Sequence, residues 1–181
     1  MAGPRIKYTV NDYMTAPPDK RYQLLDGEMI LAPSPTTRHQ RILLRLYQAV
    51  NDFVASHRLG EVLVAPCDVI LSNHDVAQPD VLFVSNQRSD IITEANVQGA
   101  PDLVVEVLSP GTSQYDRGYK RSLYGRYGVR EYWLVDPEAE AVEVLTAGEQ
   151  GLLSHATYRR DDTLASPLLV GLVISLGQIF E

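Results

Sequence analysis

The stretch PDLVVEVLSPGTSQYDRGYKRSLYGRY, residues 101–127, decides the fold of this chain. It opens as an apolar run that predicts a buried strand, and one carboxylate, Glu106, stands in the middle of that run. The residues SPG (109–111) predict a turn, and the residues after them predict a helix that carries Lys120. An ionised carboxylate among valines is costly to bury without a partner. We therefore expect the helix to bring Lys120 back toward Glu106.

A second acid is needed to make a site of this kind, and two Pro-Asp pairs offer Asp80 and Asp102. Asp102 and Glu106 lie on one strand, four residues apart, which separates them by roughly 13 Å. One metal ion with oxygen ligands at about 2.0–2.6 Å cannot bridge that distance. Asp80 begins a different strand, and neighbouring strands bring side chains within about 5 Å. Asp80 is therefore the better partner, although an aspartate that only bonds backbone N–H groups at a strand start is the alternative.

Two carboxylates with open positions favour Mg²⁺ or Mn²⁺, hard cations that keep several waters. Asp80 and Glu106 are the expected metal ligands, and Lys120 is the expected third catalytic residue, which positions the attacking water and stabilises developing charge. Asp116 lies one helical turn before Lys120 and is expected to orient it. Arg117 belongs to a run of basic residues that predicts a phosphate-facing patch; the alternatives are a structural Glu106–Lys120 ion pair and a solvated basic face.

The rest of the chain predicts a mixed α/β (α+β) fold with one central mixed sheet and a long helix on each side. Asp26-Gly27 between apolar runs predicts a hairpin over 22–31. Apolar residues at helical spacing predict a long helix from Thr37, where Thr37 and Gln40 have the spacing of a capping box. Strands are expected at 61–65, 68–71, 80–85, 131–135 and 141–145, with weaker signals at 154–158 and 168–174, and nothing indicates a second domain within 1–181.

Composition narrows the classes of function. The net charge of −7 argues against indiscriminate nucleic-acid binding, because phosphate contacts need a local excess of Lys and Arg. Cys67 is the single cysteine, so no intrachain disulfide can form, as is common in a reducing cytoplasm. The first ten residues, MAGPRIKYTV, contain no apolar run typical of a signal peptide, and no stretch approaches the length of a membrane span. A cytoplasmic protein without membrane contact is expected.

Four segments together resemble a known family: QPDVLFVS (78–85), PDLVVEVLSPGT (101–112), DRGYKRSLYGRYGV (116–129) and EYWLVDP (131–137). They are similar to the PD-(D/E)XK nuclease superfamily, and more closely to its Uma family of small bacterial restriction endonuclease-like proteins. The resemblance covers roughly residues 5–180. It implies a sheet flanked by helices and a divalent-metal phosphodiesterase site, in which Asp80 matches the aspartate of the motif and Glu106 its second acid.

The chain departs from the superfamily pattern where Leu108 stands at the usual place of the lysine. Lys120, on the following helix, matches the position to which this family moves it. His39, on the inward side of the first long helix, is expected to bind a phosphate or water, or else only to cap the packing there. Glu28, in the hairpin, is expected either to approach the site or to lie exposed at a sheet edge.

Three functions follow from these expectations. The first is a Mg²⁺- or Mn²⁺-dependent endonuclease that hydrolyses DNA phosphodiester bonds. The alternatives are a nuclease-fold binding or assembly module without turnover, which the charge of −7 and the displaced lysine favour, and a hydrolase of small phosphoesters. A homodimer is expected because small nucleases of this shape often pair to address two strands. The C-terminal LLVGLVISL (168–176) is either interface or core.

Overall fold

The fold is described by a computed structural model, in which residues 7–17 and 20–181 are described. The expectation about a signal peptide rests partly on residues 1–6, which lie outside the described residues. In chain order the elements are α1 (Val10–Met14), β1 (Tyr22–Leu25), β2 (Glu28–Leu31), α2 (Thr37–His57), β3 (Gly60–Val64), β4 (Val69–Ser72), β5 (Asp75–Ala77), β6 (Val81–Ser85), the 3-10 helix η1 (Asn86–Ile91), β7 (Val97–Gln98), β8 (Leu103–Val107), α3 (Ser113–Tyr115), the π-helix η2 (Asp116–Lys120), α4 (Arg121–Tyr127), β9 (Glu131–Asp136), β10 (Ala141–Gly148), β11 (Gly151–Arg159), β12 (Thr163–Ala165), β13 (Val173–Ser175) and α5 (Leu176–Ile179).

The centre of the fold is a six-stranded sheet in the order β11-β10-β9-β8-β6-β3. Its strands pair antiparallel except for β8 and β9, which run parallel, so the predicted mixed sheet is confirmed. Val81 of β6 lies opposite Val105 of β8. Continued by one residue, this register sets Asp80 opposite Glu106, at the end of the sheet where β8 leaves it.

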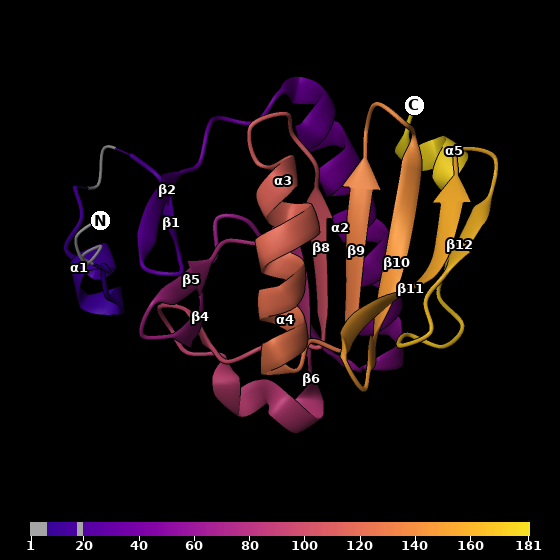
Figure 1. The fold of residues 1–181 in the computed structure, drawn as a ribbon. Helices are drawn as coiled ribbons and strands as arrows, with labels where there is room; N and C mark the ends of the chain where they lie inside the picture. The colour runs from indigo at the N-terminus through magenta and orange to yellow at the C-terminus, as the bar shows by residue number, and fades with distance from the viewer. Residues whose placement is uncertain (1–6, 18–19) are drawn as a thin grey trace.

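Helices cover both faces of this sheet, as Figure 1 shows with α2 behind the strands and α3 and α4 in front. Along β8 the side chains alternate between the two faces, as the pleat of a strand requires. Leu103, Val105 and Val107 pack in the core that contains the α2 residues, whereas Val104 packs in the core of Leu123 on α4. Burial on both faces explains why this strand is apolar throughout, and it makes the charged Glu106 exceptional.

The first long helix, α2, begins at Thr37, but the capping interaction differs from the predicted one. Thr36, in extended conformation, is the N-cap, and its side chain accepts a hydrogen bond from the backbone N–H of His39 at 3.2 Å. The capping box expected from Thr37 and Gln40 was therefore wrong by one residue. Thr36 and Thr37 both have a hydroxyl group that can cap a helix, and the backbone geometry decides which of the two is the N-cap.

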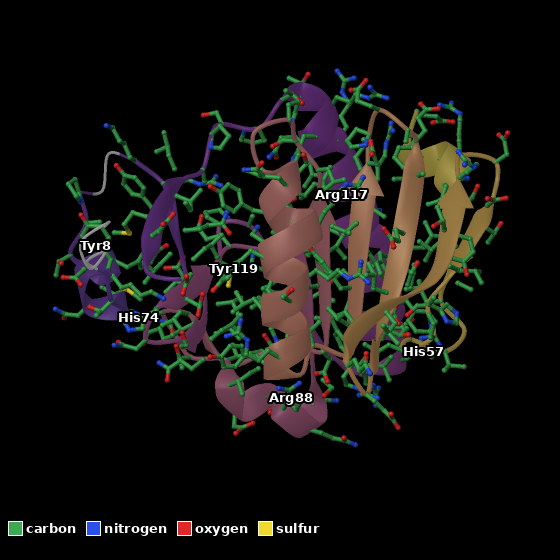
Figure 2. The ribbon with its side chains drawn as sticks, in the orientation of Figure 1. Tyr8, His57, His74, Arg88, Arg117 and Tyr119 are labelled. Atoms are coloured by element: carbon green, nitrogen blue, oxygen red, sulfur yellow. The ribbon has the colours of Figure 1, made fainter. Side chains whose placement is uncertain are left out.

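A second sheet corrects the expectation of a single one. Its five strands follow the order β2-β1-β5-β4-β7, and it includes the predicted hairpin with its turn at Asp26-Gly27. The polar residues SNHD (72–75) form the turn between β4 and β5. The sequence analysis missed β5 because this strand has only three residues. Figure 2 shows Tyr119 directed from the helical segment toward this sheet, where its hydroxyl donates to Asp75 Oδ1 at 2.6 Å.

The C-terminal segment covers the α2 side of the central sheet with a two-stranded sheet, β12 and β13. Within LLVGLVISL, Leu169, Leu172, Ile174 and Leu176 are buried in the core, while Val170 and Val173 are mostly exposed. The segment is therefore largely core. Dimer formation stays a prediction, as does a single domain over 1–181. In the part of the chain that the structure describes, no helix is long and apolar enough to cross a membrane.

Glu131, at the start of β9, is a fully buried acid that holds the C-terminal segment against the sheet. Its carboxylate accepts hydrogen bonds from Trp133 Nε1 at 2.6 Å, from Ser166 Oγ at 2.8 Å and from the backbone N–H of Leu168 at 2.7 Å. Burial raises the pKa of Glu131 above its ordinary value, and these three donors oppose the rise. The carboxylate thus joins two segments that lie more than thirty residues apart.

The raised pKa of Glu131 predicts a pH dependence of stability. A carboxyl whose folded pKa lies above its unfolded value contributes most below the unfolded value of about 4.3, and this contribution is lost as pH rises through the folded pKa. As pH rises, the free energy of unfolding of the wild type is therefore expected to fall relative to that of Glu131→Gln. Urea unfolding between about pH 4 and pH 8 measures it, and a constant difference would contradict the prediction.

Candidate active site

A cavity of about 700 Å³ opens beside the end of β8. Its walls come from the loop before α2, the first turn of α2, the start of β6 and the loop after β8. Five of the predicted site residues line it: His39, Asp80, Glu106, Arg117 and Lys120. Two other predicted residues do not line it, since Asp116 lies behind Lys120 and the exposed Glu28 sits on β2.

Asp80 and Glu106 meet at this cavity as cross-strand neighbours, as the sequence analysis predicted. Asp80 Oδ2 accepts a hydrogen bond from the backbone N–H of Val107 at 2.7 Å, which ties it to the strand that carries Glu106. Asp102 is fully buried and accepts from the backbone N–H of Ser85 at 2.8 Å, away from the cavity. The structure therefore places the two candidate ligands together and leaves Asp102 with a structural role.

Lys120 reaches Glu106 from the helical segment after β8. Its Nζ lies 2.9 Å from Glu106 Oε1 and 2.9 Å from Asp116 Oδ1, and all three side chains are buried. The sequence predicted a regular helix here, but residues 116–120 form a π-helix between α3 and α4. Such a segment contains one extra residue per turn and occurs frequently at functional sites. It sets Asp116 and Lys120 on the same side, facing the carboxylate.

Tyr124 is a member of the site that the sequence analysis missed. Its hydroxyl donates a hydrogen bond to Glu106 Oε1 at 2.8 Å, and the side chain is fully buried. A spacing of four residues from Lys120 was the available signal, because residues four apart share one face of a helix. An aromatic ring at such a position is more typical of core packing, and the sequence analysis did not single out Tyr124 as a site residue.

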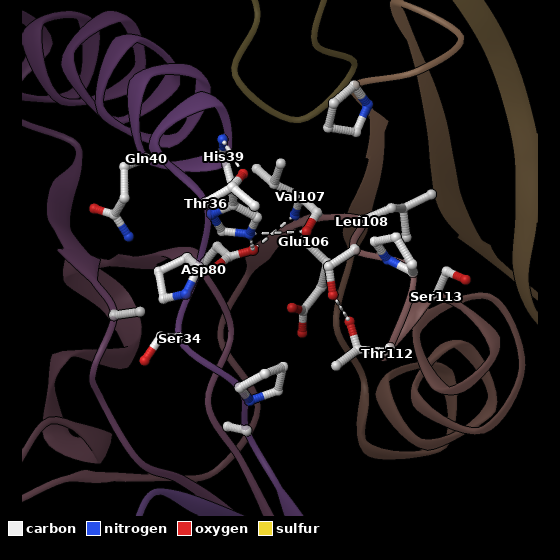
Figure 3. A pocket seen from close by; sticks show the side chains of 18 of the residues that line it. Ser34, Thr36, His39, Gln40, Asp80, Glu106, Val107, Leu108, Thr112 and Ser113 are labelled. Carbon is white, nitrogen blue, oxygen red and sulfur yellow. Dashed lines mark hydrogen bonds and ion pairs between the residues drawn. The ribbon is translucent and has the colours of Figure 1, made fainter.

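His39 approaches Asp80 from the first turn of α2. Its Nε2 lies 3.2 Å from Asp80 Oδ2 and 3.0 Å from the carbonyl oxygen of Val107, and dashed lines mark these contacts in Figure 3. Burial lowers the pKa of His39, but the hydrogen bond and charge of Asp80 and the Val107 carbonyl outweigh it, so that the pKa is raised overall. Both neighbours are acceptors, and a proton on Nε2 therefore holds His39 against Asp80.

The arginines do not form the patch that the sequence predicted. Arg117 lines the cavity, but its guanidinium is 2.9 Å from Asp136 Oδ2 near the end of β9, as its position in Figure 2 illustrates. Arg38 is similarly paired, at 3.1 Å from Glu138 Oε1, and Arg121 is bonded to the carbonyl oxygen of Leu152. The run of positive charges is thus dispersed, because a helix directs successive residues to different sides.

One arginine at the cavity keeps its charge uncompensated. Arg21, which precedes β1, lines the cavity and makes no ion pair with any residue within 7–17 or 20–181. It is exposed, so its guanidinium meets solvent at the cavity mouth. The sequence analysis did not single it out, because nothing local distinguishes it from other surface arginines.

Three acids, Asp80, Glu106 and Asp116, lie close to the single Lys120 beside the cavity. Burial raises the pKa of Glu106 to about 8, against the opposing charge of Lys120, and the charges of Asp116 and Asp80 add to the rise. Burial lowers the pKa of Lys120, but the charges of Glu106 and Asp116 raise it above its ordinary value, so the lysine stays charged. Lys120 thus contacts two buried carboxylates, with Asp80 close by, and a bound cation would oppose the raised pKa of Glu106 in the same way as the lysine does.

The donor set suits a hard cation held largely by water. Among the described residues, no group of three or more His, Cys, Asp or Glu side chains is arranged to hold a metal ion. Mg²⁺, however, is commonly held by one or two carboxylates and keeps several waters. Asp80 and Glu106 supply two carboxylates at one cavity and therefore fit Mg²⁺ or Mn²⁺.

The central mixed sheet with helices on both faces defines a mixed α/β fold of the restriction endonuclease-like kind. The chain belongs to the Uma2 family, described as "Putative restriction endonuclease", which matches residues 10–177. The family resemblance inferred from the sequence motifs is therefore confirmed.

Two individual proteins are similar to this chain. The crystal structure of a "putative nuclease belonging to DUF820" from Anabaena variabilis superposes with a TM-score of 0.78 at 21% identity, covering 95% of this chain and 97% of that one. It confirms the predicted fold. An uncharacterized protein of Synechocystis sp. is 26% identical over 149 residues, which are 80% of this chain and 76% of that protein.

Proposed function

We propose that this protein is a metal-dependent endonuclease that hydrolyses phosphodiester bonds of DNA. The observation that carries the proposal is the meeting of Asp80 and Glu106 from neighbouring strands at one cavity, with the buried Lys120 bonded to Glu106. Membership of a family described as "Putative restriction endonuclease" supports the same class of reaction. Hydrolysis adds one water to the phosphodiester and leaves a phosphate monoester and a hydroxyl group.

Asp80 and Glu106 would hold the Mg²⁺ or Mn²⁺ ion, which supplies a Lewis acid and lowers the pKa of bound water. The other residues act on this pair. Lys120 contacts Glu106 at 2.9 Å and opposes the rise in its pKa, and Asp116 contacts Lys120 at the same distance. His39 holds Asp80 at the cavity, where its proton can also meet a substrate phosphate.

Among the described residues, the three arginines that line the cavity differ in how readily they could bind a polyanionic substrate. Arg21 offers a guanidinium free to contact phosphate, whereas Arg38 and Arg117 already face carboxylates. A net charge of −7 confines phosphate binding to such local positions. We infer a DNA strand that enters beside Arg21 and places one phosphodiester near Asp80. A homodimer, a cytoplasmic location and the absence of membrane contact stay predictions.

Cleavage of supercoiled plasmid tests this function directly. The wild type is expected to convert the plasmid to nicked and linear forms with Mg²⁺ or Mn²⁺ and to lose this activity in excess EDTA, because two carboxylates alone cannot generate the nucleophile at neutral pH. Gel electrophoresis over time measures the rate. Chromogenic phosphodiesters in parallel separate a DNA enzyme from a hydrolase of small phosphoesters. Equal conversion with and without metal would contradict the proposal.

A nuclease fold that binds without turnover is the second candidate. The observation in its favour is that the side chain of Lys120 is only 2% exposed and is already bonded to two carboxylates. A lysine held in this way stabilises the acids but has little freedom to follow a reacting water. DNA binding measured by fluorescence anisotropy, together with no cleavage in Mn²⁺ by a folded protein, would identify this function.

A further inference from the structure

Two donors converge on the same oxygen of Glu106. Tyr124 Oη donates to Oε1 at 2.8 Å, and Lys120 Nζ donates to Oε1 at 2.9 Å. Within the described chain, no hydrogen bond is made to the second oxygen, Oε2, although Glu106 lines the cavity. The carboxylate is therefore held by one end, and its other end is available to a ligand in the cavity.

Lys120 by itself is poorly suited to set this orientation. Its ammonium group has three rotatable donors on a flexible stem, and it is shared with Asp116 at the same distance of 2.9 Å. Its bonding is divided between two carboxylates, so Lys120 is not directed to Glu106 alone. A second donor that is directed to Glu106 would select which oxygen faces the cavity.

Among the described residues, the Tyr124 hydroxyl donates to Glu106 alone. The ring of Tyr124 is fully buried and packs edge-on against Tyr132, with ring centroids 5.1 Å apart and an interplanar angle of 72°. The hydroxyl is thus a donor held at a fixed place beside Glu106.

We propose that Tyr124 is a positioning residue, which fixes the Glu106 carboxylate with Oε1 turned inward and Oε2 turned to the cavity, where it meets the divalent cation. This inference rests on the proposed function, since it assigns a supporting partner to one of the proposed metal ligands. Partners that hold a metal ligand in place commonly change metal affinity by about 10- to 100-fold when they are removed.

Tyr124→Phe tests the inference, and Tyr132→Phe is the matched control. Both changes remove one buried hydroxyl from the same ring pair, but the Tyr132 hydroxyl donates to the backbone carbonyl of Asp116 at 3.0 Å and not to Glu106. Calorimetric titration with Mn²⁺ is expected to show about tenfold weaker binding for Tyr124→Phe and nearly unchanged binding for Tyr132→Phe. Circular dichroism confirms that each variant is folded, and a higher Mn²⁺ concentration is expected to restore the cleavage rate of Tyr124→Phe.

The outcomes separate this inference from the proposed function. Wild-type affinity in Tyr124→Phe, or an equal loss in both variants, overturns the positioning role alone. Absence of Mn²⁺ binding by the folded wild type at millimolar concentration overturns the proposed function and the positioning role with it. Glu106→Gln gives a second test that does not depend on the folding of Tyr124→Phe. Its carbonyl oxygen satisfies Tyr124 and Lys120, its NH₂ group faces the cavity, and Mn²⁺ binding is expected to be lost; wild-type binding would overturn the inference.

Discussion

Exchanging Asp80 for asparagine is expected to reduce metal-dependent DNA cleavage by about a thousandfold while the protein stays folded. The amide oxygen of the variant still accepts the hydrogen bond from the Val107 N–H, which Asp80 Oδ2 accepts at 2.7 Å. What is lost is the negative charge that would hold the cation. A metal ion contributes several kcal/mol of charge stabilisation in the transition state, and each ~1.4 kcal/mol is a factor of ten in rate.

The control for this variant is Asp136→Asn, the same chemical change at the rim of the same cavity. Asp136 bonds to the backbone of the turn after β9 and pairs with Arg117, and the proposed mechanism gives it no part in metal binding. Initial rates of plasmid nicking in Mg²⁺ are expected to fall sharply for Asp80→Asn and to stay near the wild-type value for Asp136→Asn. Equal rates for Asp80→Asn and wild type would rule out Asp80 as a metal ligand.

Exchanging Lys120 for methionine is expected to lower the free energy of unfolding by about 3–5 kcal/mol, because it removes one partner from a buried ion pair. Methionine fills nearly the same volume, so the loss reports charge and not a cavity. The lysine side chain is 2% exposed, and both carboxylates that it contacts, Glu106 and Asp116, are buried as well. Without Lys120 these two acids lose their shared cation, and water cannot replace it. Urea unfolding monitored by circular dichroism measures the change.

Lys7→Met makes the same substitution in an ion pair at the surface. Lys7 contacts Asp26, but their side chains are 50% and 61% exposed, and such pairs contribute at most about 1 kcal/mol. Adding Glu106→Gln to Lys120→Met is expected to recover part of the lost stability, because one of the two uncompensated acids disappears. A loss for Lys120→Met no larger than that for Lys7→Met would contradict a buried ion pair at the site.

Local pattern predicted the elements that depend on nearby residues. The Asp26-Gly27 hairpin, the long helix from Thr37 and the apolar strand around Glu106 each follow from a period or a turn signal that is complete within its own segment. The pairing of Asp80 with Glu106 was also predictable, because a strand geometry excluded Asp102 by distance. These expectations did not depend on knowing the contacts between segments that are distant in the sequence.

Contacts between distant segments could not be predicted in this way. Tyr124 and Ser166 carry no local signal of a partner, yet each donates a hydrogen bond to a distant buried acid, to Glu106 and to Glu131 respectively. The second sheet depends on a three-residue strand whose pattern is too short to detect. The dispersal of the arginines depends on which acids the β9–β10 turn brings near them.

By itself, the sequence determined that a carboxylate would be buried at Glu106 and that Lys120 would return to it, since a charge among valines has few other ways to be stabilised. Only the tertiary structure decided how that carboxylate is oriented. Orientation depends on which donors reach which oxygen, and these donors come from a π-helical segment and an aromatic pair whose positions are set by packing across the whole sheet.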